Sequence, residues 1–360
     1  MNLAFRAVAS LGAALTAVAL PLAFALPAQA STPGWRVVFG THYGAATDYS
    51  GYLTAVAPSK LDLWALGGSD LSGGTPAVPV AEHWNGKVWS AGVLPAAVTS
   101  SAKSAIEAAS AVSPSNIWAV TQFGGFVLHY NGAWSVAKQL AGSGQLTGIT
   151  AISSTNVWVF GAGGFTGGLG TWHYNGSTWT QQTGNASGIA SASAVSASNI
   201  WAIGSSGSAP QDAIVHYNGT AWQRVKATAL TGRQFNRILA ISATNVWVSA
   251  ENPSNGTAGF LVHFNGSQWS KVTLPWTVAT GDPASDGKGG IWLAVQDGSR
   301  RFWVAHRSAA GTWTRTLIGS TPTFVPSLAL IPGTTAVWGA GSFAKGSAAN
   351  AGVWAYGVIP

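Results

Sequence analysis

Cysteine is absent from this 360-residue sequence, and charged residues make up only 8% of it. The lack of cysteine excludes a disulfide framework, a catalytic thiol and a lipid-bearing cysteine. The sequence also has no G-x-S-x-G motif, no zinc or calcium motif and no recognisable nucleic-acid-binding module. The sequence does contain 19 tryptophans. Because no disulfide can form, the burial of these aromatic side chains has to supply much of the stability.

The first thirty residues (1–30) have the features of a secretory signal peptide. Arg6 precedes a long apolar run, which ends in a small-x-small sequence from Ala28 to Ala30. We expect cleavage after Ala30 and a secreted, extracellular protein. The alternative, a membrane anchor, is disfavoured because Pro21 and Pro27 interrupt the apolar run. No later stretch is long and apolar enough to give a stable membrane span.

Two series of tryptophans divide the rest of the chain into repeats. The first series comprises Trp64, Trp118, Trp158, Trp201, Trp247, Trp292 and Trp338. The second comprises Trp35, Trp89, Trp134, Trp179, Trp222, Trp269 and Trp313. Members of the first series lie 40 to 54 residues apart, and a period in the forties is typical of four-stranded propeller blades.

Each repeat shows the same order of features. A strand of small residues ends in an S-x-x-[N/D] turn, a strand beginning [V/I/L]-W follows, and a variable loop leads to the third strand. Asn-Gly, the strongest short hairpin signal, then joins the third strand to the fourth. With a two-residue loop in HYNGAW, we expect His129 to pair with Trp134, and the other blades to repeat this His–Trp pair. The sixth and seventh repeats depart from the pattern, with Gly290 and Ala336 at the turn position.

The two ends of the mature chain supply parts of one repeat. The last repeat stops after its third strand, with Ala355 and Tyr356 where histidine and tyrosine usually stand. STPGWRVVF near the start matches the fourth-strand pattern, so Trp35 should complete the blade that holds Trp338. Such closure removes an open sheet edge. The predicted fold is all-β: residues 31–360 form a single seven-bladed β-propeller closed by an N-terminal strand.

The repeats resemble those of secreted β-propellers of the tectonin type. The resemblance rests on the first tryptophan series in the second strand and the second series in the fourth strand. In the third strand it rests on Trp84, Tyr130, Tyr174, Tyr217 and Phe264. It covers nearly all of residues 34–357 and implies a propeller fold. Because tectonin-type propellers are often lectins, it also implies carbohydrate binding.

Six of the seven histidines occupy one position of the repeat: His83, His129, His173, His216, His263 and His306. One imidazole per blade places them around a ring, whereas a metal ion needs three or four ligands within about 2 Å of one point. We therefore expect no metal site and no cofactor. We interpret the histidines as framework residues that hydrogen-bond to neighbouring backbone.

Carboxylates are few, and four fall in or beside the loops between second and third strands: Asp70, Asp212, Glu251 and Asp297. Paired carboxylates are what glycoside cleavage requires, so a carbohydrate-active hydrolase or lyase remains an alternative. Their Gly/Ser-rich surroundings are typical of solvated loops.

Basic residues are concentrated in the fourth to sixth blades, where they could face an acidic polysaccharide or a cell-surface glycan. Strand parity places the following residues at or near the face with the variable loops: Arg233, Arg237, Trp276, Arg300, Arg301 and Trp303. Guanidinium groups bind carboxylate or sulfate in a fork, and indoles stack on sugar rings.

We therefore predict a non-catalytic, lectin-like recognition propeller, expected to be monomeric and not to bind nucleic acid. The alternatives are the carbohydrate-active enzyme and a surface scaffold for protein contacts.

Overall fold

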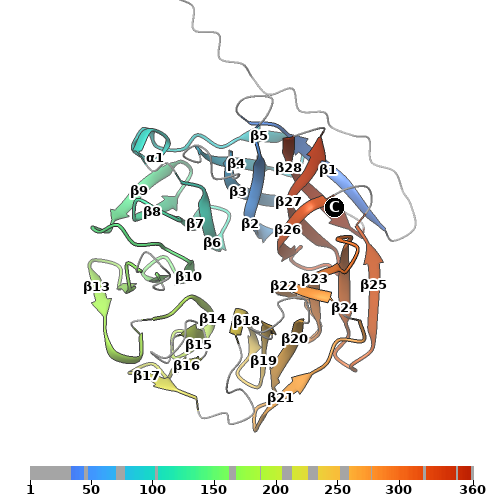
Figure 1. Cartoon of the computed structure of the whole chain (residues 1–360). Coiled ribbons are helices and arrows are strands. Elements are labelled where there is room, and N and C mark those ends of the chain that lie inside the picture. Colours follow the sequence, from blue (N-terminus) through green and yellow to red (C-terminus); the bar gives the residue numbers. More distant parts are fainter. Residues whose placement is uncertain are drawn as a thin grey trace, which may run out of the picture.

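Seven four-stranded antiparallel sheets stand around a central axis as the blades of a propeller (Figure 1). The computed structural model describes residues 34–357 except 44–47, 70–77, 102–103, 162–167, 187, 205–212, 226–233, 252–258, 277, 319–321 and 346–347. The predicted all-β, seven-bladed fold is confirmed. The segment 1–30 lies outside the described residues, so secretion stays a prediction.

Within each blade the strands follow one another from the axis outward. Blade 1 contains β2 (Ser50–Ser59), β3 (Asp62–Ser69), β4 (Val78–Trp84) and β5 (Trp89–Ala91). Blade 2 contains β6 (Ile106–Ser113), β7 (Asn116–Thr121), β8 (Phe126–Tyr130) and β9 (Trp134–Gln139). Blade 3 contains β10 (Gly148–Ser153), β11 (Asn156–Phe160), β12 (Thr171–Tyr174) and β13 (Trp179–Gln182). Blade 4 contains β14 (Ser191–Ser196), β15 (Asn199–Gly204), β16 (Ala213–Tyr217) and β17 (Trp222–Arg224).

The remaining blades follow the same order. Blade 5 contains β18 (Gln234–Ser242), β19 (Asn245–Glu251), β20 (Gly259–Phe264) and β21 (Trp269–Val272). Blade 6 contains β22 (Val278–Ser285), β23 (Ile291–Asp297), β24 (Phe302–Arg307) and β25 (Trp313–Leu317). Blade 7 contains β26 (Pro322–Leu330), β27 (Val337–Lys345), β28 (Ala348–Tyr356) and β1 (Trp35–Thr41). Two short helices, α1 (Ala96–Ser101) and η1 (Gly184–Ala186), lie in connections between blades.

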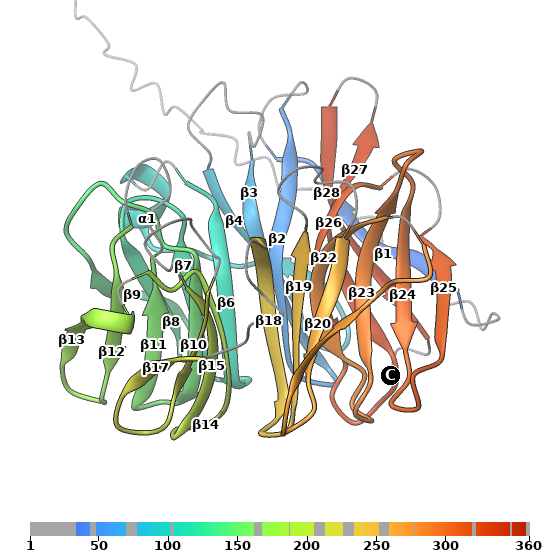
Figure 2. The same cartoon turned by 60° about the horizontal axis from the view of Figure 1, so that its bottom comes forward.

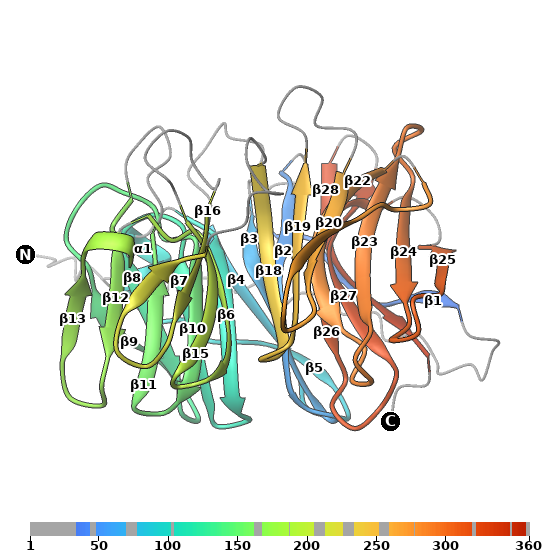
Figure 3. The ribbon, with the colours of Figure 1, turned by 90° about the horizontal axis from the view of Figure 1, so that it is seen from below.

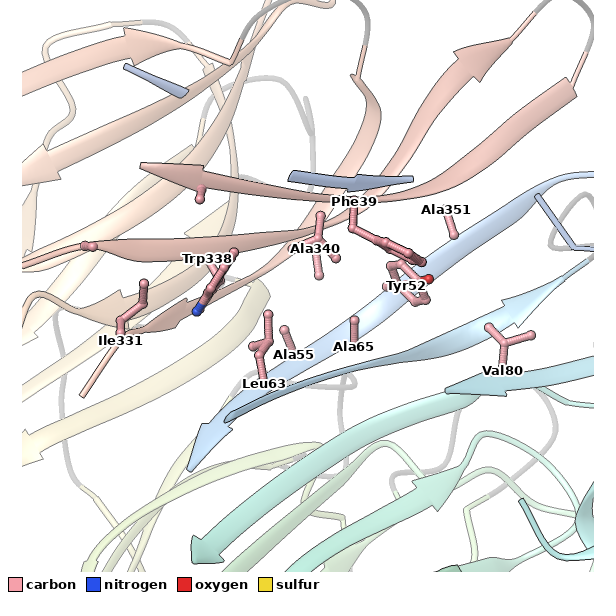
Figure 4. Packing of buried hydrophobic residues seen from close by; sticks show 13 residues of the cluster. Phe39, Tyr52, Ala55, Leu63, Ala65, Val80, Ile331, Trp338, Ala340 and Ala351 are labelled. Atoms are coloured by element: carbon pink, nitrogen blue, oxygen red, sulfur yellow. The ribbon is translucent and has the colours of Figure 1, made fainter. Parts of the chain in front are cut away.

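Closure of the ring by β1 is confirmed. β1 pairs antiparallel with β28, and Trp35 lies opposite Tyr356 as the outer strand of blade 7. Figure 2 shows β1 beside β28, whose end projects with β27 beyond the neighbouring strands. Phe39 of β1 packs into the core shared by blades 7 and 1, close to Tyr52 (Figure 4), and its ring stacks on that of Trp89 at 4.6 Å.

A buried polar cluster reinforces this seam. The hydroxyl of Tyr43, just after β1, donates a hydrogen bond to the Glu82 carboxylate at 2.6 Å and lies 3.1 Å from the Tyr52 hydroxyl. Glu82 is buried, and burial raises the pKa of its carboxyl group above the usual range. The segment that closes the ring is therefore held by polar contacts as well as by apolar packing.

The Asn-Gly hairpins differ from the predicted register by one residue. Tyr130, not His129, lies opposite Trp134, and the loop between them has three residues rather than two. The left-handed glycine (Gly132, φ 103°) and the residue after it both belong to the loop, which moves the pair one place along the strand. The same Tyr–Trp pair recurs as Tyr217 and Trp222, and the predicted pairing of His129 with Trp134 is wrong.

The histidines pair instead with the first tryptophan series on the second strand. His129 lies opposite Trp118, and the two rings stack at 4.1 Å. Its Nε2 lies 3.0 Å from Oδ1 of Asn116, the last residue of the S-x-x-N turn. The histidines are thus framework residues, as expected, but their partner is the side chain of the turn residue rather than the backbone. In blade 6, which lacks the turn asparagine, Asp286 takes this place 2.9 Å from His306.

Alternating strand directions give the propeller two different faces. The S-x-x-N and Asn-Gly turns lie on one face, named here the turn face, along the lower edge in Figure 3. The connections from second to third strands and from blade to blade lie on the other, the loop face. The variable segments 70–77, 162–167, 252–258 and 346–347 belong to these connections and lie outside the described residues.

Small residues let the inner strands approach one another around an axial channel. Ser110 of blade 2 accepts a hydrogen bond from the Ala151 amide of blade 3 at 3.0 Å, and Ser193 does the same for Ala240. Backbone groups on the inner sheet edges are satisfied in this way by the preceding blade. Between the inner strands of blades 2, 3 and 4 the channel contains a cavity of about 390 Å³.

Candidate functional site

The loop between β23 and β24 of blade 6 is built around one carboxylate. Asp297 Oδ1 accepts hydrogen bonds from the backbone amides of Ser299 and Arg301, both at 3.0 Å. Between them Arg300 adopts a left-handed conformation with φ 59°, which is unusual for a residue other than glycine. The turn holds Arg300 exposed at the loop face and directs Arg301 back toward the blade.

The second oxygen of Asp297 organises the neighbouring side chains. Oδ2 accepts hydrogen bonds from Nε of Arg301 and from the indole Nε1 of Trp303, each at 2.9 Å. Burial acts to raise the pKa of Asp297, but the hydrogen bonds from Trp303, Arg301 and Ser299 outweigh it and lower this pKa to about 2. Asp297 is therefore ionised at neutral pH and fixes Arg301 beside Trp303, with the guanidinium 5.4 Å from the indole.

Arg315 of β25 completes the arrangement. Its guanidinium lies between two indoles, 4.3 Å from the ring centroid of Trp303 and 4.8 Å from that of Trp276. Ala305 lies directly opposite Arg315 on the next strand, and this short side chain leaves room for the guanidinium. Within the described part of the chain Arg315 makes no hydrogen bond or ion pair, so its N–H groups keep their capacity to bind an anion.

These five residues, Trp276, Asp297, Arg301, Trp303 and Arg315, are named here the rim cluster, because they lie at the outer part of the interface between blades 5 and 6. Three residues predicted from the sequence, Trp276, Arg301 and Trp303, come together in it. Arg300 is exposed in the adjoining turn. Arg233 lies outside the described residues.

Arg237, predicted together with the other binding residues, does not belong to the rim cluster. It lies on the innermost strand of blade 5 and extends into the channel. Its Nε donates to Asp282 of blade 6 at 3.2 Å, and its Nη2 lies 3.8 Å from Glu107 of blade 2. Blades 2 and 5 do not adjoin in the ring, so only a side chain crossing the channel can connect them. Glu107, Arg237 and Asp282 are named here the channel triad.

Irregular pairing of the inner strands allows the triad to form. Glu107 occupies a bulge between Ile106 and Ala108, and Asp282 lies in an irregular stretch between Thr280 and Pro283. A bulge redirects a side chain relative to the regular alternation of a strand. All three charged groups therefore reach the same level of the channel, toward the loop face.

The triad's charges influence one another. Burial raises the pKa of Asp282 and that of Glu107, while the charge of Arg237 acts in the lowering direction on both. The nearby Asp282 carboxylate raises the pKa of Arg237 above its usual value. The arginine keeps 35% of its side chain exposed and Asp282 keeps 37%, so the cluster is in contact with the open part of the channel.

The carboxylates proposed from the sequence form no catalytic pair among the described residues. Asp297 is occupied by its hydrogen bonds to the rim cluster, and Glu251 lies at the end of β19. Asp70 and Asp212 lie outside the described residues. In the same part of the chain no group of three or more His, Asp or Glu side chains is placed to hold a metal ion.

Sequence reasoning missed Glu107 and Asp282, although a signal was present. Across the seven inner strands, as the structure bounds them, only Glu107, Arg237 and Asp282 are charged. Charges in strands otherwise made of small and apolar residues need partners. The channel is the one place where all seven inner strands meet, so those partners could have been sought in one another.

Comparison with known proteins shows the fold and no family. No protein-family model and no curated protein matches the chain. A structure of YCF48 bound to D1 peptide is similar, with a TM-score of 0.60 and 15% identity over 93% of this chain and 98% of that one. Catalytically inactive virginiamycin B lyase from Staphylococcus aureus with quinupristin has a TM-score of 0.55 and 10% identity, over 90% and 99% of the two chains.

A fungal six-bladed lectin, that of Aleuria aurantia, has a TM-score of 0.45 and 13% identity over 77% of this chain and 97% of that one. The likenesses to YCF48 and to the lyase support a β-propeller fold and leave its ligand open. The resemblance to tectonin-type repeats accordingly extends to the propeller architecture. No helix among the described residues has the length and apolar character needed to cross a membrane.

Proposed function

We propose that this chain is a secreted, non-catalytic recognition propeller that binds an acidic polysaccharide or glycan through the rim cluster. The observation that carries the proposal is the guanidinium of Arg315, held between the indoles of Trp276 and Trp303 without a carboxylate partner in the described residues. A cation positioned by two aromatic rings is preorganised and keeps its N–H groups for an external anion.

The surrounding side chains suit a sugar that carries carboxylate or sulfate. A guanidinium binds such groups through two parallel hydrogen bonds. The half-buried indoles of Trp276 and Trp303 offer apolar surface to the C–H groups of a sugar ring, and the exposed Arg300 and Arg301 add positive charge. A shallow site of this kind gains affinity when several units of one polymer bind together.

The experiment compares Arg315→Ala with Arg224→Ala on an array of acidic and neutral glycans. Arg224 occupies the same position in blade 4, two residues after the second-series tryptophan, so each variant loses one positive charge from the outer strand of its blade. We expect Arg315→Ala to weaken binding of acidic glycans about tenfold or more, and Arg224→Ala to weaken it less than about twofold.

Salt supplies a second readout. Binding by the parent should decrease as salt rises, because exposed charges are screened beyond about 10 Å at 0.1 M ionic strength. The proposal is wrong if the parent binds no acidic glycan. It is also wrong if the two variants bind these glycans equally well.

A further inference from the structure

One interface in the ring, between blades 1 and 2, has a glycine where blades 3 to 6 carry larger residues. In blade 1, Ser90 lies opposite His83 on the face toward blade 2, and Gly92 follows on the same face. A Cβ atom at Gly92 would lie 2.6 Å from the ring of Trp64, so the backbone passes directly over that indole. Larger residues stand at the position of Gly92 in blades 3 to 6: Gln182, Val225, Val272 and Thr316.

Beside this close approach lies a groove of about 700 Å³, named here the blade 1–2 groove. Trp64 and His83 line it from blade 1, and Tyr130 and Trp134 line it from blade 2. At its border Val93 is 85% exposed. This volume is within the range of small-molecule sites. None of the described residues that line it is Asp, Glu, Lys or Arg, so the groove has no charge to attract an ion.

A second departure from the repeat places a free hydroxyl in the groove. In blades 3 and 4 the hydroxyls of Tyr174 and Tyr217 donate to the carbonyl of the turn glycine, at 2.8 and 2.9 Å. The turn of blade 2 is one residue shorter, and the hydroxyl of Tyr130 has no such bond among the described residues. It remains able both to donate and to accept a hydrogen bond.

His83 supplies a further polar atom. Its Nε2 lies 3.2 Å from the carboxylate of Asp62, which can only accept, so the proton of the neutral ring lies on Nε2. Nδ1 then keeps a lone pair, and it makes no hydrogen bond in the described part of the chain. With the exposed hydroxyl of Ser90, the groove presents an acceptor and two hydroxyls beside aromatic and aliphatic side chains.

We infer that the blade 1–2 groove binds one unit of an uncharged saccharide. The C–H face of a pyranose ring would pack on Tyr130 and Val93, and its hydroxyls would bond to the Tyr130 hydroxyl, Nδ1 of His83 and Ser90. Uncharged sugars fit this lining because they combine apolar faces with several hydroxyl groups and need no counter-charge. The site is separate from the rim cluster and does not depend on it.

The test measures binding of a panel of uncharged oligosaccharides of glucose, galactose, mannose, fucose and N-acetylglucosamine by isothermal titration calorimetry. Ser90→Gln fills the groove with a side chain that the repeat tolerates, because Gln223 stands at the same position in blade 4. Its matched control is Thr180→Gln in blade 3, an exposed residue that lies opposite His173 just as Ser90 lies opposite His83. Tyr130→Phe removes only the hydroxyl.

We expect the parent and Thr180→Gln to bind the same uncharged oligosaccharide equally well. Ser90→Gln should lose at least tenfold in affinity, and Tyr130→Phe about three- to tenfold. Arg315→Ala should bind it like the parent, which separates this site from the proposed acidic-glycan site. The inference is overturned if no member of the panel binds the parent. Equal binding by Ser90→Gln and Thr180→Gln would overturn it as well.

Discussion

Arg237 and Arg315 stand on neighbouring blades and have opposite surroundings. Arg237, on the inner strand of blade 5, crosses the channel to two carboxylates on blades 2 and 6. Arg315, on the outer strand of blade 6, lies between two indoles at the rim and has no carboxylate partner among the described residues. One guanidinium is neutralised inside the molecule, and the other is left available to a ligand.

The difference shows that position in the repeat determines what an arginine can do. An inner strand faces other inner strands across a confined space, where an unpaired charge is costly and carboxylates have to compensate it. An outer strand borders solvent, where aromatic rings can orient a guanidinium without neutralising it. Counting basic residues along the sequence cannot separate these two situations.

The largest expected effect comes from removing the channel arginine. Arg237→Met leaves Glu107 and Asp282 without their counter-charge. Removing one partner of a fully buried ion pair costs about 3–5 kcal/mol, and the exposure of this triad should reduce the loss to about 2 kcal/mol. Arg315→Met should change the free energy of unfolding by less than about 1 kcal/mol. Chemical denaturation of both variants measures the difference.

A rescue separates charge from packing in this prediction. Adding Glu107→Gln and Asp282→Asn to Arg237→Met removes the unpaired carboxylates and should restore most of the lost stability. If the triple variant is no more stable than Arg237→Met, the triad contributes through shape rather than charge. An equal loss in Arg315→Met would remove the contrast between the two arginines.

A smaller effect is expected at the rim, on binding rather than on stability. Asp297→Asn removes the negative charge that pairs with Arg301 and keeps a similar shape. Acidic glycans should then bind about two- to fivefold more tightly at low salt, because the net positive charge of the rim cluster increases. Titration at low and high salt measures this gain, which salt should abolish. Weaker binding at both salt concentrations would mean that Asp297 serves the ligand chiefly by orienting Arg301.

Much of the fold could be predicted because its determinants are local. The tryptophan series, the S-x-x-N turns and the Asn-Gly hairpins each specify a few residues, and their repetition specifies the ring. The predicted register of the Asn-Gly hairpins was wrong by one residue, because the spacing from His129 to Trp134 does not show how many residues the loop contains. That number depends on the backbone of Gly132 and the residue after it, which only the structure shows.

The sites were predicted less completely, because they depend on contacts between blades. Strand parity brought Trp276, Arg301 and Trp303 to one face, and they do meet. Parity could not show that Arg315 lies between two of these side chains, since that requires the short side chain of Ala305 opposite it. The channel triad joins residues on blades 2, 5 and 6, and the bulge that redirects Glu107 has no clear mark in the sequence.

The smallest expected effect is on pH dependence, and it again separates the two arginines. Burial raises the pKa of Glu107 and Asp282 in the folded state, so their contribution to stability is fully present below the unfolded pKa of about 4. It is lost as pH rises through the raised folded values. Without the lowering effect of Arg237, the pKa values of Glu107 and Asp282 should rise further. Arg237→Met should therefore lose more stability than the parent does as pH rises from 4 to 7.

The histidines affect the pH dependence of stability in the opposite direction to the channel carboxylates, and they are the same in the parent and in all variants. Burial lowers the pKa of His129, His173 and His216 in the folded state. Their contribution to folding stability is therefore present above the unfolded pKa of about 6.5, and it is lost as pH falls through the lower pKa values of the folded state. Subtracting the parent's stability at each pH from that of each variant cancels this shared effect. This difference in stability should grow with rising pH for Arg237→Met and should not change with pH for Arg315→Met. If it does not change with pH for either variant, Arg237 does not control the titration of the channel carboxylates.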